Sequence, residues 1–174
     1  MTDLLRTMAT EHHLPPSRRS IGIGELAVSS APELTIATHA VGSCIVVCIY
    51  DPVAAVAGML HFLLPDSTIN PERAAGNPAV FADTGIPLLF QTAYEHGLVK
   101  QRVVVKLIGG AEMPQTAARF DTGRRNLLAA RGLLWRNGLF VAADDVGGTD
   151  ARTVHMSVAD GRLQVFSGRM FKEL

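Results

Sequence analysis

The fold is decided by residues 44–64, which read CIVVCIYDPVAAVAGMLHFLL. Two apolar runs rich in β-branched residues, 44–50 and 55–64, flank the segment Asp51-Pro52-Val53-Ala54. Such runs predict strands, and Asp at the first and Pro at the second position of a turn favour a type I turn between them. The stretch therefore predicts a β-hairpin.

The register of this hairpin brings a thiol and an imidazole together. With a two-residue loop, the numbers of facing residues sum to 105, so Cys44 faces His61 and Cys48 faces Ala57. Facing Cβ atoms lie roughly 4.5 to 5.5 Å apart. A four-residue loop keeps Cys44 and His61 on one face as diagonal neighbours, whereas a three-residue loop or a bulge places them on opposite faces. The two-residue register thus predicts a direct Cys/His pair.

Such a pair suits nucleophilic catalysis. A free thiol has a pKa near 8.5, and an adjacent imidazolium favours the thiolate and can later protonate a leaving amine. Gly42 and Ser43 leave backbone N–H groups close to the Cys44 sulfur, which makes them candidates for an oxyanion site. The arrangement would serve acyl transfer or amide hydrolysis. His39 is a second candidate base, because it is close to Cys44 in sequence.

A structural role is the competing interpretation of the same residues. Free cysteine is among the most buried residue types, and a lone histidine in an apolar strand is more often a core residue with a satisfied hydrogen bond. The residues alone leave both interpretations of Cys44 and His61 open. Cys48 lies deeper in the same run, and we expect it to be inert core.

Neither a disulfide nor a metal site is expected at the two cysteines. In an extended strand, residues four apart stand about 13 Å apart, whereas a disulfide needs Cα atoms within about 7 Å. A Cys-x3-Cys spacing without a second nearby Cys/His pair also lacks the ligands for zinc. No metal or other cofactor is therefore expected.

The composition predicts a single domain. The chain has 174 residues, 48% of them hydrophobic, and its 16 basic residues balance 16 acidic ones. Its neutral charge argues against nucleic acid or an anionic membrane as partner. The uncharged stretch 34–50 is shorter than the roughly 20 residues of a membrane helix, and no signal peptide is evident, so we expect a cytoplasmic protein without membrane insertion.

The order of the remaining patterns predicts an α+β fold. Residues 1–19 have the composition of a flexible tail, which leaves residues 20–174 as the domain. Helices are predicted at 83–96 and 122–137, and a loop at 65–78. Further strands are predicted at 22–28, 34–38, 103–108, 139–146, 152–158 and 162–167. We expect mostly antiparallel strands in layered sheets, with the two main helices packed on one side.

Between Ile21 and Phe166 the sequence resembles the CheD family, the chemoreceptor glutamine deamidases of bacterial chemotaxis. The resemblance rests on the order and spacing of several short motifs, because no single motif is specific to the family. They are Ile21-Gly-Ile-Gly-Glu25, Ala27-Val28, Gly42-Ser43-Cys44, Tyr50-Asp51-Pro52-Val53, His61-Phe62, Leu64-Pro65, Ala82-Asp83, Gly109-Gly110-Ala111, Met113, Gly123, Arg125-Asn126, Asp145, Gly147-Gly148 and Arg152.

The resemblance implies a Cys/His/Thr site. It assigns Cys44 as nucleophile, His61 as general base and acid, and Thr38 as the group that orients the histidine, in preference to His39. The implied reaction converts receptor glutamines to glutamates through a thioester and needs no cofactor. The resemblance also implies hydrolysis of glutamyl methyl esters as a second activity. The implied partners are the cytoplasmic helices of chemoreceptors and a CheC-type phosphatase, and a non-catalytic adaptor that binds these partners is the alternative.

The chain departs from the family pattern just before the cysteine. Thr38-His39-Ala40-Val41 stands where the family usually has a segment of the kind Thr-Leu-Gly-Leu. The loss of a glycine at position 40 suggests that the backbone there does not need a positive φ.

Overall fold

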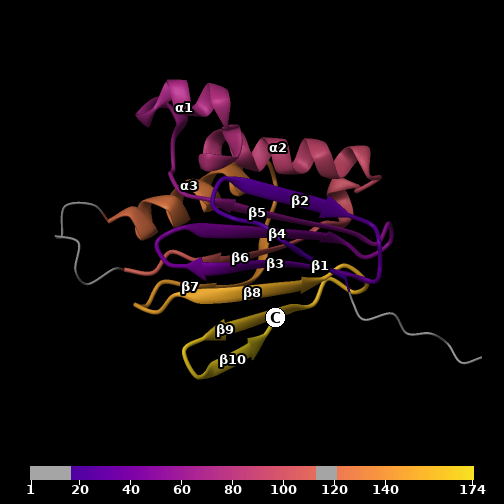
Figure 1. Cartoon of the computed structure of the whole chain (residues 1–174). Helices are drawn as coiled ribbons and strands as arrows, with labels where there is room; N and C mark the ends of the chain where they lie inside the picture. Colours follow the sequence, from indigo (N-terminus) through magenta and orange to yellow (C-terminus); the bar gives the residue numbers. More distant parts are fainter. Residues whose placement is uncertain (1–16, 113–120) are drawn as a thin grey trace, which may run out of the picture.

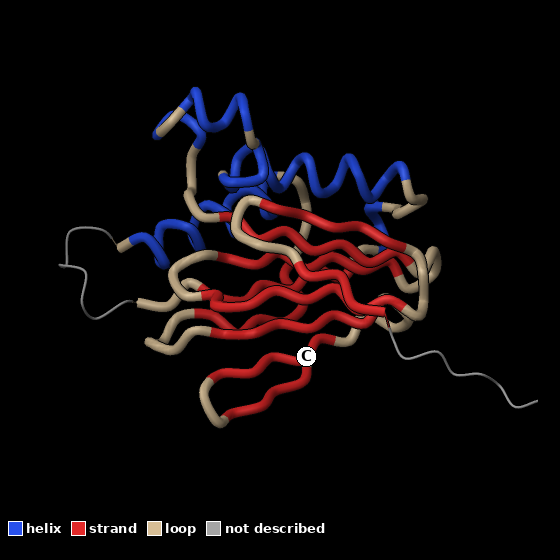
Figure 2. Tube along the Cα trace, in the orientation of Figure 1, coloured by secondary structure: helices blue, strands red, loops and turns tan. Residues whose placement is uncertain are grey.

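The computed structural model describes residues 17–112 and 121–174, which form two stacked β-sheets with helices on one side (Figure 1). We call β1-β3-β8-β9-β10 the outer sheet and β2-β5-β4-β6-β7 the central sheet, with the strands in spatial order. The helices lie against the central sheet, so this sheet is covered on both faces (Figure 2).

The strands and helices have the following bounds. The strands are β1 (Ser17–Ser20), β2 (Glu25–Ser29), β3 (Leu34–Val41), β4 (Ile45–Asp51), β5 (Val56–Phe62), β6 (Val104–Gly109), β7 (Val141–Val146), β8 (Arg152–Ser157), β9 (Leu163–Ser167) and β10 (Met170–Glu173). The α-helices are α1 (Pro71–Gly76), α2 (Ala82–Glu95) and α3 (Thr122–Arg136), and short 3-10 turns are η1 (Ser67–Ile69), η2 (Pro78–Val80) and η3 (Lys100–Arg102). No helix among these described residues is long and apolar enough to cross a membrane.

Most neighbouring strands run antiparallel, as the sequence predicts. The exceptions within the described residues are two parallel pairs, β1 with β3 and β6 with β7. Together with the two long helices on one side, this pairing confirms the predicted α+β class.

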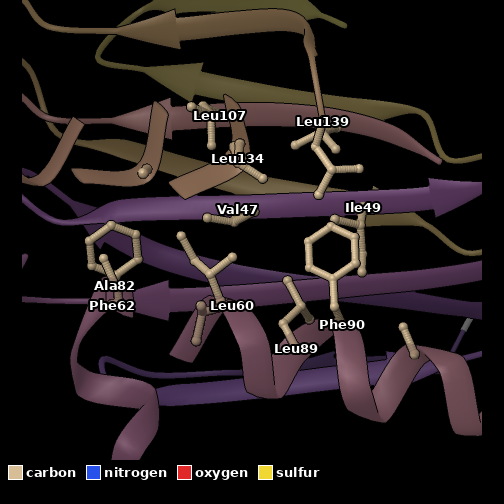
Figure 3. Close-up of a cluster of buried hydrophobic side chains, with 14 of the residues drawn as sticks. Val47, Ile49, Leu60, Phe62, Ala82, Leu89, Phe90, Leu107, Leu134 and Leu139 are labelled. Carbon is tan, nitrogen blue, oxygen red and sulfur yellow. The ribbon is translucent and has the colours of Figure 1, made fainter. Parts of the chain in front are cut away.

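Two apolar layers hold the fold together. Side chains of β4 alternate between them, because successive residues of a strand point to opposite faces. Val46, Cys48 and Tyr50 face the outer sheet, and Ile45, Val47 and Ile49 face the helices. Figure 3 shows the helix-side layer, where Val47 and Ile49 meet Leu60 and Phe62 of β5, Leu89 and Phe90 of α2, and Leu134 of α3. The central hairpin is therefore buried on both faces.

Three local predictions need correction. Residues 17–19 were assigned to the flexible tail, but they belong to β1, which gains backbone hydrogen bonds by parallel pairing with β3; residues 1–16 lie outside the described residues. The predicted loop 65–78 contains helix α1, which Asn70 caps by accepting from the Arg73 N–H. The chain also forms β10, a short strand that the sequence did not predict.

The β4–β5 hairpin exists, but its loop has four residues instead of two. Val46 faces His61 and Asp51 faces Val56, so the numbers of facing residues sum to 107. The loop is held by Asp51, whose carboxylate accepts from the N–H groups of Val53 and Ala54, and it ends at Ala55 with a φ of 51°. The direct Cys44/His61 pairing was wrong, and the diagonal arrangement of the four-residue loop is the observed one.

Candidate active site

Cys44 and His61 lie at the same end of the central sheet and on the face toward the outer sheet. Cys44 stands directly before β4, and His61 is the penultimate residue of β5. Since Val46 faces His61 and alternate residues share a face, Cys44 is the diagonal neighbour of His61. The change from a two-residue to a four-residue loop leaves Cys44 and His61 on the same face of the sheet. The structure therefore still brings these two predicted residues together.

Thr38 reaches His61 across the gap between the two sheets. It lies in β3 of the outer sheet and is fully buried, and its Oγ1 is 2.8 Å from His61 Nδ1. The same hydroxyl donates to the carbonyl oxygen of Ile21 at 2.8 Å. A hydroxyl has one proton, so toward His61 it can only accept, and Nδ1 must carry the ring proton. Thr38 thereby fixes the tautomer in which Nε2 is the basic nitrogen.

The free nitrogen of His61 is available as a base. Nε2 is buried and has no hydrogen-bond partner in the part of the chain that the structure describes. Burial lowers the pKa of His61 to about 4, because the charged imidazolium loses its hydration there. The resting imidazole is therefore neutral at physiological pH, with its lone pair on Nε2.

Cys44 rests as a neutral thiol. Its side chain is 5% exposed, and burial raises its pKa to about 11, although its own backbone N–H acts in the opposite direction. The sequence had suggested a thiolate stabilised by an adjacent imidazolium, and the two pKa shifts contradict this for the resting site. A nucleophilic role for Cys44 would therefore require a base that takes the thiol proton.

The turn before Cys44 is fixed through its carbonyl groups. The carbonyl of Gly42 accepts from the Ala111 N–H at 2.9 Å, and that of Cys44 accepts from the Gly110 N–H at 2.8 Å. Gly109 lets the chain pass this closely, because any side chain there would collide with the Cys44 carbonyl. The predicted oxyanion donors, at Gly42 and Ser43, therefore lie in a rigidly held turn.

A bulge in β3 separates Thr38 from Val41 and corrects the expectation for position 40. Thr38 pairs with Val154 and Val41 with Arg152, so three steps along β3 oppose two along β8. The extra residue allows both Thr38 and Val41 to point inward. Ala40 takes a φ of 55°, a left-handed conformation, although the absence of glycine at this position predicts that none is needed. Position 40 thus takes a positive φ without a glycine.

His39 points away from the site. Alternation in β3 places it on the outer face of the outer sheet, where it is exposed and packs edge to face on His155 at 6.0 Å between ring centroids. His39 therefore does not share the face on which Cys44 and His61 lie. Cys48 is 1% exposed within the apolar layer between the sheets, as expected of a core residue.

Two polar residues complete the surroundings of the turn without having been assigned a role from sequence. Asn126 of α3 is fully buried and donates its side-chain amide to the carbonyls of Ser43 and Leu63. Arg152 of β8 is 6% exposed and forms an ion pair with Asp145 of β7 at 3.1 Å, which joins the two sheets. Both residues belong to motifs of the family resemblance, but their contacts depend on long-range packing that spacing does not reveal.

The described residues offer no cluster of metal ligands. Within residues 17–112 and 121–174, no three or more His, Cys, Asp and Glu side chains converge on one point, and both cysteines are free thiols. The chemistry available here is that of a thiol, an imidazole and backbone N–H groups.

Comparison with known proteins places the chain in a family. Residues 63–167 match the sequence profile described as CheD chemotactic sensory transduction. The chain is 47% identical over 154 residues to a protein of Solibacter usitatus named probable chemoreceptor glutamine deamidase CheD, covering 88% of this chain and 91% of that one. It is also 47% identical over 149 residues to a protein of Anaeromyxobacter dehalogenans named probable chemoreceptor glutamine deamidase CheD 2, covering 86% and 94%. The chain belongs to the CheD family.

Proposed function

We propose that the protein is a cysteine-dependent deamidase that converts glutamine side chains of chemoreceptors to glutamate. The observation that carries this proposal is the hydrogen bond from His61 Nδ1 to Thr38. It makes Nε2, which has no partner among the described residues, the basic nitrogen on the face that His61 shares with Cys44. The names of the relatives supply the substrate class, chemoreceptor glutamine.

The reaction proceeds in two balanced halves. As the Cys44 sulfur attacks the carboxamide carbon, His61 Nε2 takes the thiol proton, and the imidazolium then gives it to the departing NH2 group, so ammonia leaves and a γ-glutamyl thioester remains. Water next attacks the thioester while Nε2 accepts its proton. That proton returns to the sulfur, which leaves glutamate and the original thiol. Thr38 keeps the proton on Nδ1 throughout.

The tetrahedral intermediates place negative charge on the former carbonyl oxygen. In this proposal the turn supplies the donors, namely the predicted N–H groups of Gly42 and Ser43 together with the N–H of Cys44. Donors of this kind stabilise the oxyanion without reorganisation when they are fixed in advance. The bound carbonyls of Gly42 and Cys44 support that rigidity.

Partners and location follow from the same proposal. The receptor glutamines lie on helices, and the resulting glutamates serve as methylation sites, so the same thioester route would also hydrolyse glutamyl methyl esters. A CheC-type phosphatase is the proposed protein partner and the cytoplasm the proposed location.

Mass spectrometry of a receptor cytoplasmic fragment tests the proposal. Wild-type protein should add about 1 Da per modified glutamine and release ammonia, as exchange of NH2 for OH requires. Cys44→Ala should abolish both signals. Cys48→Ala is the matched control, because Cys48 is a second buried thiol of the same strand region, and it should retain activity.

Other outcomes identify the alternatives. Equal spectra for wild type and Cys44→Ala would leave a non-catalytic adaptor that binds receptors or a CheC-type phosphatase. Cleaved or cross-linked receptor chains would instead indicate a peptidase or a transglutaminase-like enzyme, which use the same thioester chemistry on other acyl groups.

A further inference from the structure

Asn126 links the nucleophile's turn to the end of the strand that carries the base. Its Nδ2 donates to the Ser43 carbonyl at 3.0 Å and to the Leu63 carbonyl at 2.8 Å. Ser43 immediately precedes Cys44, and Leu63 follows His61 by two residues. One side-chain amide thus joins the two chain segments of the proposed reaction just beyond the last β4–β5 pair, Ile45 with Phe62.

The direction of the Ser43 carbonyl also sets the direction of the next N–H. In a trans peptide the C=O and N–H bonds point opposite ways, and the peptides described here are all trans. Asn126 lies on α3, on the helix side of the central sheet, so it draws the Ser43 carbonyl toward that side. The N–H of Cys44 must then point away from α3. Its effect on the thiol, whose pKa it lowers, agrees with that direction.

The Ser43–Cys44 peptide depends on Asn126 more than its neighbours do. The flanking carbonyls of Gly42 and Cys44 are held by backbone donors of Ala111 and Gly110, which no side-chain substitution removes. The Ser43 carbonyl is held by a side chain. Both Nδ2 protons are used, while Oδ1 is buried and has no partner among the described residues. A buried amide that leaves one acceptor unpaired is costly, which indicates that its two donated bonds matter.

We infer that Asn126 is a positioning residue, whose side-chain amide orients the Cys44 N–H as an oxyanion donor and holds the Cys44 turn against the end of β5. The inference deepens the proposed deamidase and rests on it for its catalytic consequence. Its effect should fall on the transition state more than on substrate binding, since the oxyanion forms only as the sulfur attacks.

Two variants of Asn126 separate hydrogen bonding from packing. Asn126→Asp keeps the shape but replaces the donor by a carboxylate that faces two carbonyls, and Asn126→Ser is smaller and cannot reach both. For the folded variants we expect kcat on the receptor fragment to fall about 100-fold with KM within about twofold of wild type. Asn137→Ala is the control, because Asn137 also donates to a backbone carbonyl, at the exposed end of α3.

Alkylation of Cys44 by iodoacetamide provides a readout that needs no receptor. Peptide-level mass spectrometry follows the rate at Cys44 against pH. Loss of the oriented N–H should raise the thiol pKa and slow alkylation at a given pH by about tenfold, the effect of one pKa unit. Asn137→Ala should follow the wild-type profile.

The outcomes distinguish this inference from the proposed function. If wild type does not deamidate the receptor fragment, the proposed function fails, and the alkylation profiles still judge Asn126. If wild type deamidates and folded Asn126→Asp has the same kcat, the inference fails alone. Three outcomes would each show that Asn126 serves structure only. The first is a loss of kcat/KM that comes from a higher KM and not from a lower kcat. The others are an alkylation profile of Cys44 equal to that of wild type and failure of both variants to fold.

Discussion

Thr38 shows how one hydroxyl can decide the state of a histidine. Its proton is committed to the Ile21 carbonyl, so its lone pair must face His61 Nδ1. Burial then keeps the imidazole neutral. A carboxylate in the same place would favour the imidazolium, whereas a hydroxyl holds the ring without charging it. The pair therefore suits a base that starts neutral and is protonated only during the reaction.

Replacement of Thr38 tests this role. Thr38→Val has nearly the same shape but leaves Nδ1 and the Ile21 carbonyl unpaired, so the ring can take the other tautomer. We expect kcat for deamidation to fall by at least about tenfold, since general acid–base catalysis contributes about 10²- to 10⁴-fold. Nitrogen-15 NMR of His61 should report the change of tautomer. Thr38→Ser keeps the hydroxyl and should keep both the wild-type kcat and the wild-type tautomer of His61. A Thr38→Val enzyme with wild-type kcat would refute the proposed role of Thr38.

At the scale of elements, the bulge in β3 gives the site its shape at a cost in backbone energy. Ala40 occupies a left-handed conformation that glycine adopts freely, and L-residues with a Cβ pay about 1–2 kcal/mol for it. The bulge persists because Thr38 and Val41 are both anchored in the buried layer. The strand thus retains strain next to the candidate site.

Ala40→Gly should therefore stabilise the protein. The free energy of unfolding, measured by urea titration, should rise by about 1 kcal/mol, the balance of relieved strain and a more flexible unfolded chain. Ala37→Gly is the control with the opposite sign, because Ala37 lies buried in the regular part of β3, where glycine weakens a strand. A drop in stability for Ala40→Gly would show that the left-handed conformation carries no strain here.

The hairpin illustrates what local sequence could and could not predict. The apolar runs and Asp51-Pro52 predicted the two strands, and parity placed Cys44 and His61 on one face. The register was wrong because the loop length depends on remote groups. The Asp51 carboxylate also accepts from the Val99 N–H, 48 residues away, and from the Arg102 guanidinium, 51 residues away, and these contacts hold the four-residue turn.

The candidate site shows the same limit. Cys44 and His61 come from one hairpin, and their proximity followed from local pattern. Thr38 comes from another sheet and Asn126 from a helix, so residue pattern alone gave neither a contact with the pair. Thr38 was found only through the family resemblance. The positive φ of Ala40 could not be predicted either, because a constraint imposed by packing on both sides overrode the residue's own preference.

At the scale of the whole molecule, the two sheets meet through an apolar layer, and several polar links connect them. Thr38 with His61 is one, and Arg152 with Asp145 is another. The imidazole therefore titrates inside the contact between the sheets, and its protonation affects the stability of the entire fold.

Acid should destabilise the protein through His61. In the unfolded chain His61 binds a proton near its ordinary pKa of about 6.5, whereas in the folded state it does so only near 4. Between these values the unfolded state binds more protons, so the free energy of unfolding falls as the pH falls, by up to about 3 kcal/mol. Urea titrations from pH 7 to pH 4 should show this slope.

Two substitutions identify the source of the slope. His61→Gln removes the titrating ring and should flatten the pH dependence in that window. His96→Gln changes an exposed histidine at the end of α2 and should leave it intact. An unchanged slope in His61→Gln would assign the acid sensitivity to other groups.

The division of the site between the two sheets has a consequence for biosynthesis. The thiol and the imidazole can meet as soon as one hairpin forms, but the hydroxyl that selects the imidazole's tautomer arrives only when the second sheet docks. In the proposed mechanism, a chain whose sheets have not yet packed together would lack the hydrogen bond that sets the tautomer of His61. Deamidation would then depend on contact between the two sheets, so a partly unfolded chain should be inactive even where its hairpin has formed.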